Sequence, residues 1–148
     1  MRDKGTICIC SSADFYRHAS DIAKELLTLG FRVEIPITVK KMRRSGNFKA
    51  SDYRTWLKDA NTYHRKTYLM KNHFDKIARS DALLVVNDEK RGIRGYIGTN
   101  VLMEMGLGFY LMKPIYMLNK VYDDMPVYEE VRAMNCVVID NDLSKIKL

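Results

Sequence analysis

The sequence predicts an α/β protein with a doubly wound, flavodoxin-like or Rossmann-like sheet of five parallel strands, in the order 2-1-3-4-5. Short apolar segments alternate with amphipathic stretches along the 148 residues, which is typical of strands joined by helical crossovers. Residues 82–86, ALLVV, are apolar throughout, as in a strand covered on both faces. A hydrophobic content of 47% with 29% charged residues is ordinary for a globular protein, so we expect a single domain over residues 1–148.

The first strand and the first helix are predicted within the first thirty residues. Residues 6–11, TICICS, indicate a short buried strand. Residues 13–29 indicate a helix, because their apolar side chains recur every three or four positions. Ser12 is a candidate N-cap for this helix, and Gly30 is a stop signal after it.

A second strand and a long basic insertion follow. Residues 31–37 are predicted to form the strand, with Pro36 near its end, where a missing N–H does least harm. Residues 38–60 are polar, basic and poorly periodic, so we expect a long loop or lid, with a short helix near 51–58 as an option.

The remaining elements continue the alternation. Residues 63–79 predict a helix whose inward stripe includes His73, and residues 82–86 give the third strand. A loop at 87–97 leads to an apolar helix that begins near Gly98 and ends before Lys113-Pro114. The last predicted elements are a strand at 115–118, a short helix at 128–134 and a strand at 136–139.

The positive charge of the chain is concentrated in one block. The chain carries +7 in total, but residues 40–79 hold twelve Lys or Arg and three Asp, which gives that block +9. Such a block indicates an anionic partner, namely a nucleotide phosphate, a nucleic acid or an acidic protein, and a merely solvated face is the alternative. Because the block has no helix-turn-helix or RRM pattern, a nucleic-acid partner is disfavoured without being excluded.

Cofactor and metal sites are not predicted. The first strand is followed by no GxGxxG, and the chain has no GxxxxGK[ST] and no GxSxG. Cys8, Cys10 and Cys136 fall in predicted strands, and no second Cys or His pair completes a zinc set, so we expect three buried thiols. With no apolar run of bilayer length and no signal-peptide pattern in residues 1–10, the cytoplasm is the expected location and no membrane partner is expected.

Glu104 is the most informative single residue. It is the only acidic or basic side chain in residues 98–112, GTNVLMEMGLGFYLM. A helix this apolar should be buried, and a carboxylate inside it is costly unless it is paired, hydrogen-bonded or functional. A structural Glu held by an amide or an arginine is the alternative.

Other polar residues are expected near Glu104, at the carboxyl ends of the strands, where doubly wound sheets bind ligands. The start of the Glu104 helix offers free N–H groups for an anion. His73 is a candidate for proton transfer, with a structural core histidine as the alternative. Tyr96 is a candidate for stacking on a base, with plain packing as the alternative. The remaining candidates are Ser11 and Ser12 as anion contacts, and Asn87 and Asp88, which end the third strand. Asn87 and Asp88 could orient Glu104 or bind a sugar hydroxyl, and a role in the turn after the strand is the equal alternative.

Two segments resemble the nucleoside 2-deoxyribosyltransferase superfamily, which includes the 2′-deoxynucleoside 5′-monophosphate N-glycosidases. They are HFDKIARSDALLVVN, residues 73–87, and GYIGTNVLMEMGLGFYLMKPIYML, residues 95–118. The shared features are an Asp just before a hydrophobic strand, a loop with Gly, and a helix with Glu-x-Gly that ends in Lys-Pro. The resemblance is close in these segments and extends to the whole chain in the order of its elements.

The resemblance implies an activity and a site. In that family a helix glutamate attacks the anomeric carbon of a deoxynucleoside and forms a glycosyl-enzyme intermediate, and Glu104 falls on this position. The family loop that holds sugar or phosphate corresponds to Gly98, Thr99 and Asn100. A family carboxylate that assists proton transfer falls nearest His73, with Asp75 as the alternative. A small-molecule nucleoside or nucleotide is then the expected ligand, a homodimer is expected by analogy, and no cofactor is required.

Three hypotheses follow. The first is an N-glycosidic-bond enzyme, a hydrolase or a deoxyribosyltransferase, with Glu104 as nucleophile and His73, Asn87 or Asp88 as its helpers. The second is a non-catalytic nucleotide-binding or sensing module of the same fold, because Gly98 or Thr99 stands where the transferases usually carry a carboxylate. The third is a nucleic-acid-associated protein that uses the basic block.

Overall fold

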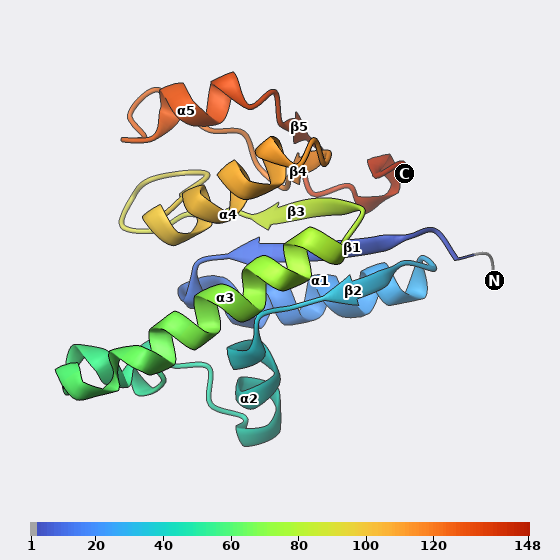
Figure 1. The fold of residues 1–148 in the computed structure, drawn as a ribbon. Coiled ribbons are helices and arrows are strands. Elements are labelled where there is room, and N and C mark those ends of the chain that lie inside the picture. Colours follow the sequence, from blue (N-terminus) through green and yellow to red (C-terminus); the bar gives the residue numbers. More distant parts are fainter. Residues whose placement is uncertain (1–2) are drawn as a thin grey trace.

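The computed structural model describes residues 3–148 and contains one five-stranded, all-parallel sheet in the order β2-β1-β3-β4-β5 (Figure 1). The predicted fold class and strand order are therefore confirmed. The strands are β1 (Thr6–Ser11), β2 (Arg32–Glu34), β3 (Ala82–Val86), β4 (Ile115–Met117) and β5 (Val137–Val138).

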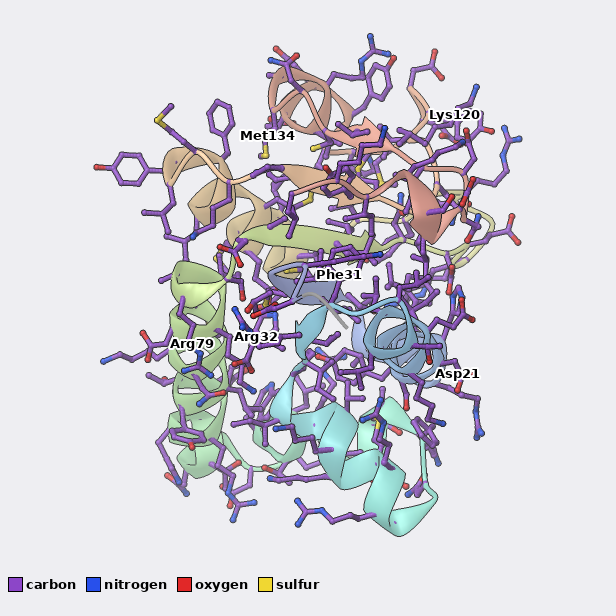
Figure 2. The ribbon with its side chains drawn as sticks, turned by 90° about the vertical axis from the view of Figure 1, so that its right-hand side faces the viewer. Asp21, Phe31, Arg32, Arg79, Lys120 and Met134 are labelled. Atoms are coloured by element: carbon purple, nitrogen blue, oxygen red, sulfur yellow. The ribbon has the colours of Figure 1, made fainter. Side chains whose placement is uncertain are left out.

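Helices cover both faces of the sheet. α1 (Tyr16–Thr28) lies on one face, and α3 (Tyr63–Arg79) and α4 (Thr99–Tyr110) lie on the other, while α5 (Tyr128–Ala133) lies near the β5 edge (Figure 1). Figure 2 shows the same layers from the side, with Asp21 of α1 and Arg79 of α3 on opposite sides of the sheet.

The side chains of β1 divide between two cores, because successive side chains of a strand point to opposite faces. Ile7 and Ile9 belong to the core beneath α1. Cys8 and Cys10 belong to the core on the opposite face, which also contains Ile77 of α3. The two cysteines therefore face the layer that carries His73.

The first helix begins differently from the prediction. A 3-10 turn occupies Ala13–Phe15, and α1 starts only at Tyr16. Ser12 occupies the N-cap position of this 3-10 turn, but its side chain makes no capping hydrogen bond, so the predicted side-chain cap is wrong. The neighbouring Ser11, the last residue of β1, donates its hydroxyl to the Ser12 carbonyl oxygen at 2.8 Å.

The predicted loop over residues 38–60 is wrong for its first part. Pro36 is the N-cap of α2 (Ile37–Ser45), which ends at Gly46 with φ of 71°. β2 is accordingly shorter than predicted, because the chain turns into this helix just after Ile35. Pro36 is therefore a helix-start signal, in keeping with the preference of proline for the first helical turn, and Gly46 is the matching stop. Beyond α2, 3-10 turns at Ala50–Asp52, Thr55–Leu57 and Ala60–Thr62 complete the insertion.

α4 is buried on one side only, so the expectation of burial all round is wrong. Val101, Glu104, Met105 and Gly108 are buried, whereas Phe109 and Tyr110 at the C-terminal end of α4, and Met112 just beyond it, are exposed. Among residues 3–148, no helix combines the length and the apolar character that a membrane crossing requires.

Two glycines of α4 give a matched test of how closely this helix approaches the sheet. A methyl group at Gly108 would lie 2.7 Å from Cδ2 of Leu83 in β3, whereas a methyl group at Gly106 meets nothing within 4 Å. We expect Gly108→Ala to destabilise the protein by about 1–3 kcal/mol through overpacking. Gly106→Ala should stabilise it by about 0.5–1 kcal/mol, because alanine has the higher helix propensity. Urea unfolding measures both, and equal effects of the two substitutions would contradict the close packing.

Candidate active site

A cavity of about 210 Å³ lies at the carboxyl ends of β1 and β2. Its wall is formed by residues that follow these two strands, by one side of α3 and by the first turns of α4. The order of the sheet reverses between β1 and β3, and this is the edge at which doubly wound sheets bind ligands. The strand order alone therefore places the cavity beside the start of α4, whatever the role of Glu104.

Glu104 lies in the cavity wall and is only 4% exposed. Its Oε1 accepts a hydrogen bond from Nδ2 of Asn100 at 3.1 Å, one helical turn earlier. Its Oε2 is buried and has no hydrogen-bond partner within the described part of the chain. Burial raises the pKa of Glu104 from 4.5 to about 7, and the nearby His73 opposes this shift. The carboxyl group can therefore exist in both protonation states near neutral pH.

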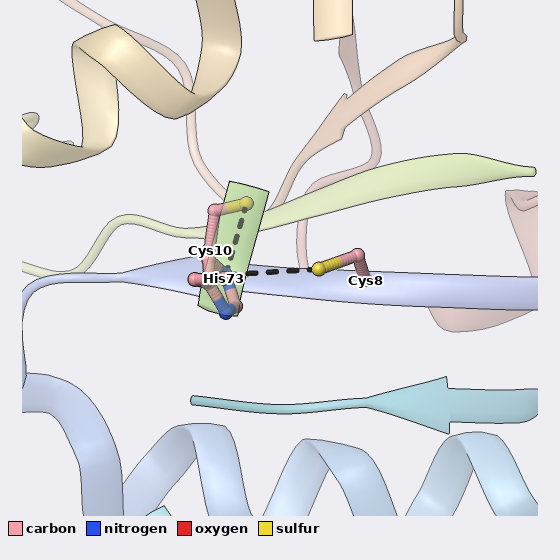
Figure 3. Close-up of side chains that lie close together, drawn as sticks. All are labelled: Cys8, Cys10 and His73. Carbon is pink, nitrogen blue, oxygen red and sulfur yellow. Dashed lines mark hydrogen bonds between the residues drawn. The ribbon is translucent and has the colours of Figure 1, made fainter. Parts of the chain in front are cut away.

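The His73 ring is surrounded by three acidic or potentially acidic groups. Its Nε2 lies 3.9 Å from Oε2 of Glu104. The same nitrogen lies 3.6 Å from Sγ of Cys8 and 3.8 Å from Sγ of Cys10 (Figure 3). Burial lowers the pKa of His73, but the hydrogen bond with Cys8 and the charge of Glu104 outweigh this effect, and the net pKa is raised. A protonated ring at this position stabilises negative charge on its neighbours.

The pKa values of the two β1 thiols are shifted in opposite directions. Hydrogen bonding with Cys10 lowers the pKa of the Cys8 thiol to about 6, against the effect of burial, and His73 adds to the lowering. Burial raises the pKa of the Cys10 thiol well above its usual value. Cys136, the third cysteine, is only partly buried. The cysteines of β1 are thus more than inert core residues, because they share a histidine with the cavity wall.

The structure brings most of the predicted site residues to the cavity. Its wall includes Ser11 and Ser12 at the end of β1, Tyr96, Glu104 and His73, together with Gly98, Thr99 and Asn100 at the start of α4. Gly98 is the N-cap of α4, and it has no side chain to occupy the free N–H groups of the first turn.

Asn87 and Asp88 are not brought to the cavity, so their predicted place beside Glu104 is wrong. Nδ2 of Asn87 donates to the carbonyl oxygen of Asn119 at 2.7 Å, and its Oδ1 accepts from the Asn119 N–H at 3.0 Å. The Asp88 carboxylate contacts Nδ1 of His18 at 2.8 Å. Asn87 therefore joins the loops after β3 and β4, and Asp88 is directed toward α1. Both residues follow β3 at the edge of the sheet where ligands are expected to bind. The topology determines at which edge of the sheet a residue lies, but it does not determine where its side chain points.

Lys66, Arg54 and Trp56 line the cavity and were not predicted individually. Nζ of Lys66 donates to Oδ1 of Asn100 at 3.3 Å and lies 5.6 Å from the centre of the Trp56 ring. Burial lowers the pKa of Lys66, and Arg54 lowers it further. The basic block at residues 40–79 was the only signal for these residues. It predicted an anionic ligand, but it did not show which of its side chains face the cavity.

The electrostatics of the cavity favour an anion near its basic side. Lys90 also lines the cavity, but its ammonium group forms an ion pair with Asp14 at 2.5 Å. Arg54 and Lys66 are cations of the wall for which no carboxylate ion pair is found within residues 3–148. The rings of Tyr16, Tyr53, Trp56 and Tyr96 give the same wall flat apolar surfaces.

Comparisons with known proteins support the fold. No protein-family model matches the chain, and no curated protein sequence matches it. Among solved structures, the chain is similar to a 2-deoxyribosyltransferase from the psychrotolerant bacterium Bacillus psychrosaccharolyticus, with a TM-score of 0.51 and 20% sequence identity. The match covers 76% of this chain and 70% of that chain. The protein therefore has the fold of a 2-deoxyribosyltransferase, as the resemblance of its sequence implies.

Proposed function

We propose that the protein is an N-glycosidic-bond enzyme that acts on a nucleoside or a nucleoside 5′-monophosphate, with Glu104 as nucleophile. The observation that carries the proposal is a buried carboxylate in a cavity wall with one oxygen that no described residue satisfies. A buried polar atom without a partner costs free energy in the resting protein. Such atoms are tolerated where a substrate or a reaction intermediate uses them.

The proposed reaction has two displacements at one carbon. The ionised Glu104 carboxylate attacks the anomeric carbon, a carbon–oxygen bond forms, and the bond to the base nitrogen breaks. The base leaves with the electron pair of that bond and is protonated by solvent or by a group of the cavity wall. Water or a second base then displaces the carboxylate, which gives hydrolysis or transfer. Covalent catalysis of this kind divides one difficult step into two easier ones.

The other residues of the cavity wall suit the two ends of such a substrate. Arg54, Lys66 and the free N–H groups at the start of α4 can hold a phosphate. Aromatic rings such as Trp56 and Tyr96 can stack on a base. The positive charge of His73 keeps the pKa of Glu104 from rising further, so that a larger share of the carboxylate is ionised at neutral pH.

A substrate panel tests the proposal. The full chain is incubated with deoxyribo- and ribonucleosides and with their 5′-monophosphates, with and without a second free base, and the products are separated by chromatography. We expect free base from at least one substrate, or a new nucleoside when a second base is present. Absence of both products across the panel, with a folded protein, would contradict the proposal.

A non-catalytic nucleotide-binding module is the second candidate. It is favoured by Gly98 and Thr99, which stand where a carboxylate is usual in the family that the sequence resembles. In that case nucleotides raise the melting temperature through binding to the native state, and no base is released over hours. The same panel, read by thermal shift and by chromatography, separates the two functions.

Asn100 is expected to act as a positioning residue. Asn100→Ala removes the hydrogen bond that Nδ2 donates to Oε1 of Glu104. Because this bond favours the charged carboxylate, its loss should raise the pKa of Glu104 above about 7. We expect kcat to fall about 10–100-fold near neutral pH, as for other residues that orient a reactive group, and the acid limb of the pH–rate profile to move to higher pH. A variant that changes KM alone and leaves the profile in place would show that Asn100 only binds substrate.

A further inference from the structure

Cys8, Cys10 and His73 bring three metal-binding atoms together behind the cavity wall. Sγ of Cys8, Sγ of Cys10 and a ring nitrogen of His73 all lie within 4.8 Å of one another, and all three residues are buried. Both sulfur atoms approach the same ring nitrogen, Nε2, at 3.6 and 3.8 Å (Figure 3). The strand supplies the two sulfurs on one face, and α3 supplies the imidazole from the layer above.

The two sulfur–nitrogen separations match an edge of a tetrahedral metal site. With zinc–sulfur bonds of about 2.3 Å and zinc–nitrogen bonds of about 2.0–2.1 Å, a tetrahedral angle puts sulfur and nitrogen about 3.6 Å apart. The two observed sulfur–nitrogen distances lie within a few tenths of an ångström of that value. A cation could therefore enter between the three atoms with small side-chain adjustments.

Glu104 supplies an independent observation that points to a fourth ligand. Its Oε2 lies 3.9 Å from the same Nε2 of His73. This oxygen is buried, and no hydrogen bond from a residue within 3–148 reaches it. The Glu104 carboxylate is therefore the candidate for a fourth ligand beside the three-atom cluster of Cys8, Cys10 and His73.

We propose that Cys8, Cys10, His73 and Glu104 form a binding site for one thiophilic divalent cation of the Zn²⁺ type. Two thiolates and an imidazole select zinc-like ions over Mg²⁺ and Ca²⁺, which prefer oxygen ligands. Each thiol that binds the metal releases its proton to solvent. His73 and Glu104 line the cavity, so the cavity gives a path for the ion to the sulfurs behind them.

Titration of the full chain with Co²⁺ tests the site directly. Chelator-treated protein, kept reduced with a phosphine, is titrated without oxygen while the absorption spectrum is recorded. We expect one equivalent of Co²⁺ to give a sulfur-to-cobalt charge-transfer band and the strong visible bands of a tetrahedral ion, and Zn²⁺ to abolish both. A stoichiometric Co²⁺ titration without a sulfur band would overturn the proposal.

Single substitutions assign the ligands. Cys8→Ser and Cys10→Ser should each weaken Co²⁺ binding by at least about tenfold and reduce the sulfur band, whereas Cys136→Ser should leave both unchanged. Glu104→Gln keeps both sulfurs, and it should weaken binding while the sulfur band remains. Far-UV circular dichroism checks that each variant is folded. Full loss of the band in Cys136→Ser, or no change in either β1 variant, would contradict the assignment.

The site has a consequence that rests on the proposed function. A metal ion bound to His73 and Glu104 occupies the nucleophile, so Zn²⁺ should inhibit base release and a chelator should restore it. The Co²⁺ titration needs no substrate, so it tests the metal site even if the protein releases no base. The substrate panel is run with a chelator present, so it tests the enzymatic function even if no metal binds. Unchanged base release at a Zn²⁺ concentration that saturates the spectral change would exclude Glu104 from the ligand set.

Discussion

Glu104→Gln is expected to reduce base release by at least about 10³-fold, which is the scale found when a catalytic nucleophile is removed. The amide has nearly the shape of the carboxyl group, and its oxygen can still accept the hydrogen bond from Asn100. It lacks the negative charge that attacks the anomeric carbon. Steady-state rates with the best substrate of the panel, followed by chromatography, measure the loss.

Glu130→Gln is the matched control for this substitution. Glu130 is an exposed glutamate of α5 and does not line the cavity. The same chemical change there should leave kcat and KM within experimental error of the parent protein. If Glu104→Gln retained full turnover, the carboxylate would have no covalent role, and the proposed mechanism would have to be abandoned.

The same substitution is expected to stabilise the protein above neutral pH. Burial raises the pKa of Glu104 from 4.5 to about 7, so the folded protein holds this proton more tightly than the unfolded chain does. At about 1.4 kcal/mol for each pKa unit, the charged carboxylate costs the folded state at most about 3.5 kcal/mol above pH 7. Glu104→Gln removes this cost, less any benefit that the charge of Glu104 gives to His73.

The stabilisation by Glu104→Gln should depend on pH. Above pH 7 the carboxylate is charged in both states, and the stabilisation by glutamine is complete. As the pH falls from 7 toward 4.5, the folded protein takes up the proton first, and the difference between the two proteins disappears. Urea unfolding of the metal-free parent and variant at pH 8 and at pH 5 measures this difference in the free energy of unfolding. A variant that is less stable than the parent at pH 8 would show that the carboxylate is held by stabilising contacts.

Much of the fold follows from the sequence because most strands are short and apolar, and because glycine and proline residues mark the ends of the helices between them. Residues 82–86 are uniformly apolar, and the predicted strand coincides with β3. α2 was missed because its nine residues, ITVKKMRRS, are mostly polar and bury only Val39 and Met42, which are too few apolar positions to indicate a helix. The exposed end of α4 was missed because apolar composition shows what a helix can bury and leaves open whether a neighbouring element covers it.

The site was less predictable, since it depends on contacts between distant segments. Glu104 stood out because a single carboxylate interrupts an apolar helix. The cluster of His73 with Cys8 and Cys10 could not be found by motif spacing, because the histidine lies more than sixty residues beyond the cysteines. Asn87 and Asp88 were misplaced because topology fixes which strand end a residue occupies, while local hydrogen bonds to Asn119 and His18 decide where its side chain points.

Trapping of the glycosyl-enzyme gives the most direct test of the role of Glu104. Metal-free protein is mixed with the best substrate of the panel, quenched in acid during the first turnovers, digested, and examined by peptide mass spectrometry. We predict a peptide from α4 that carries the added mass of the sugar, or of the sugar phosphate, with fragmentation that assigns the addition to Glu104 and with no addition in Glu104→Gln. Base release at full rate with the sugar on another residue would contradict the assignment of the nucleophile.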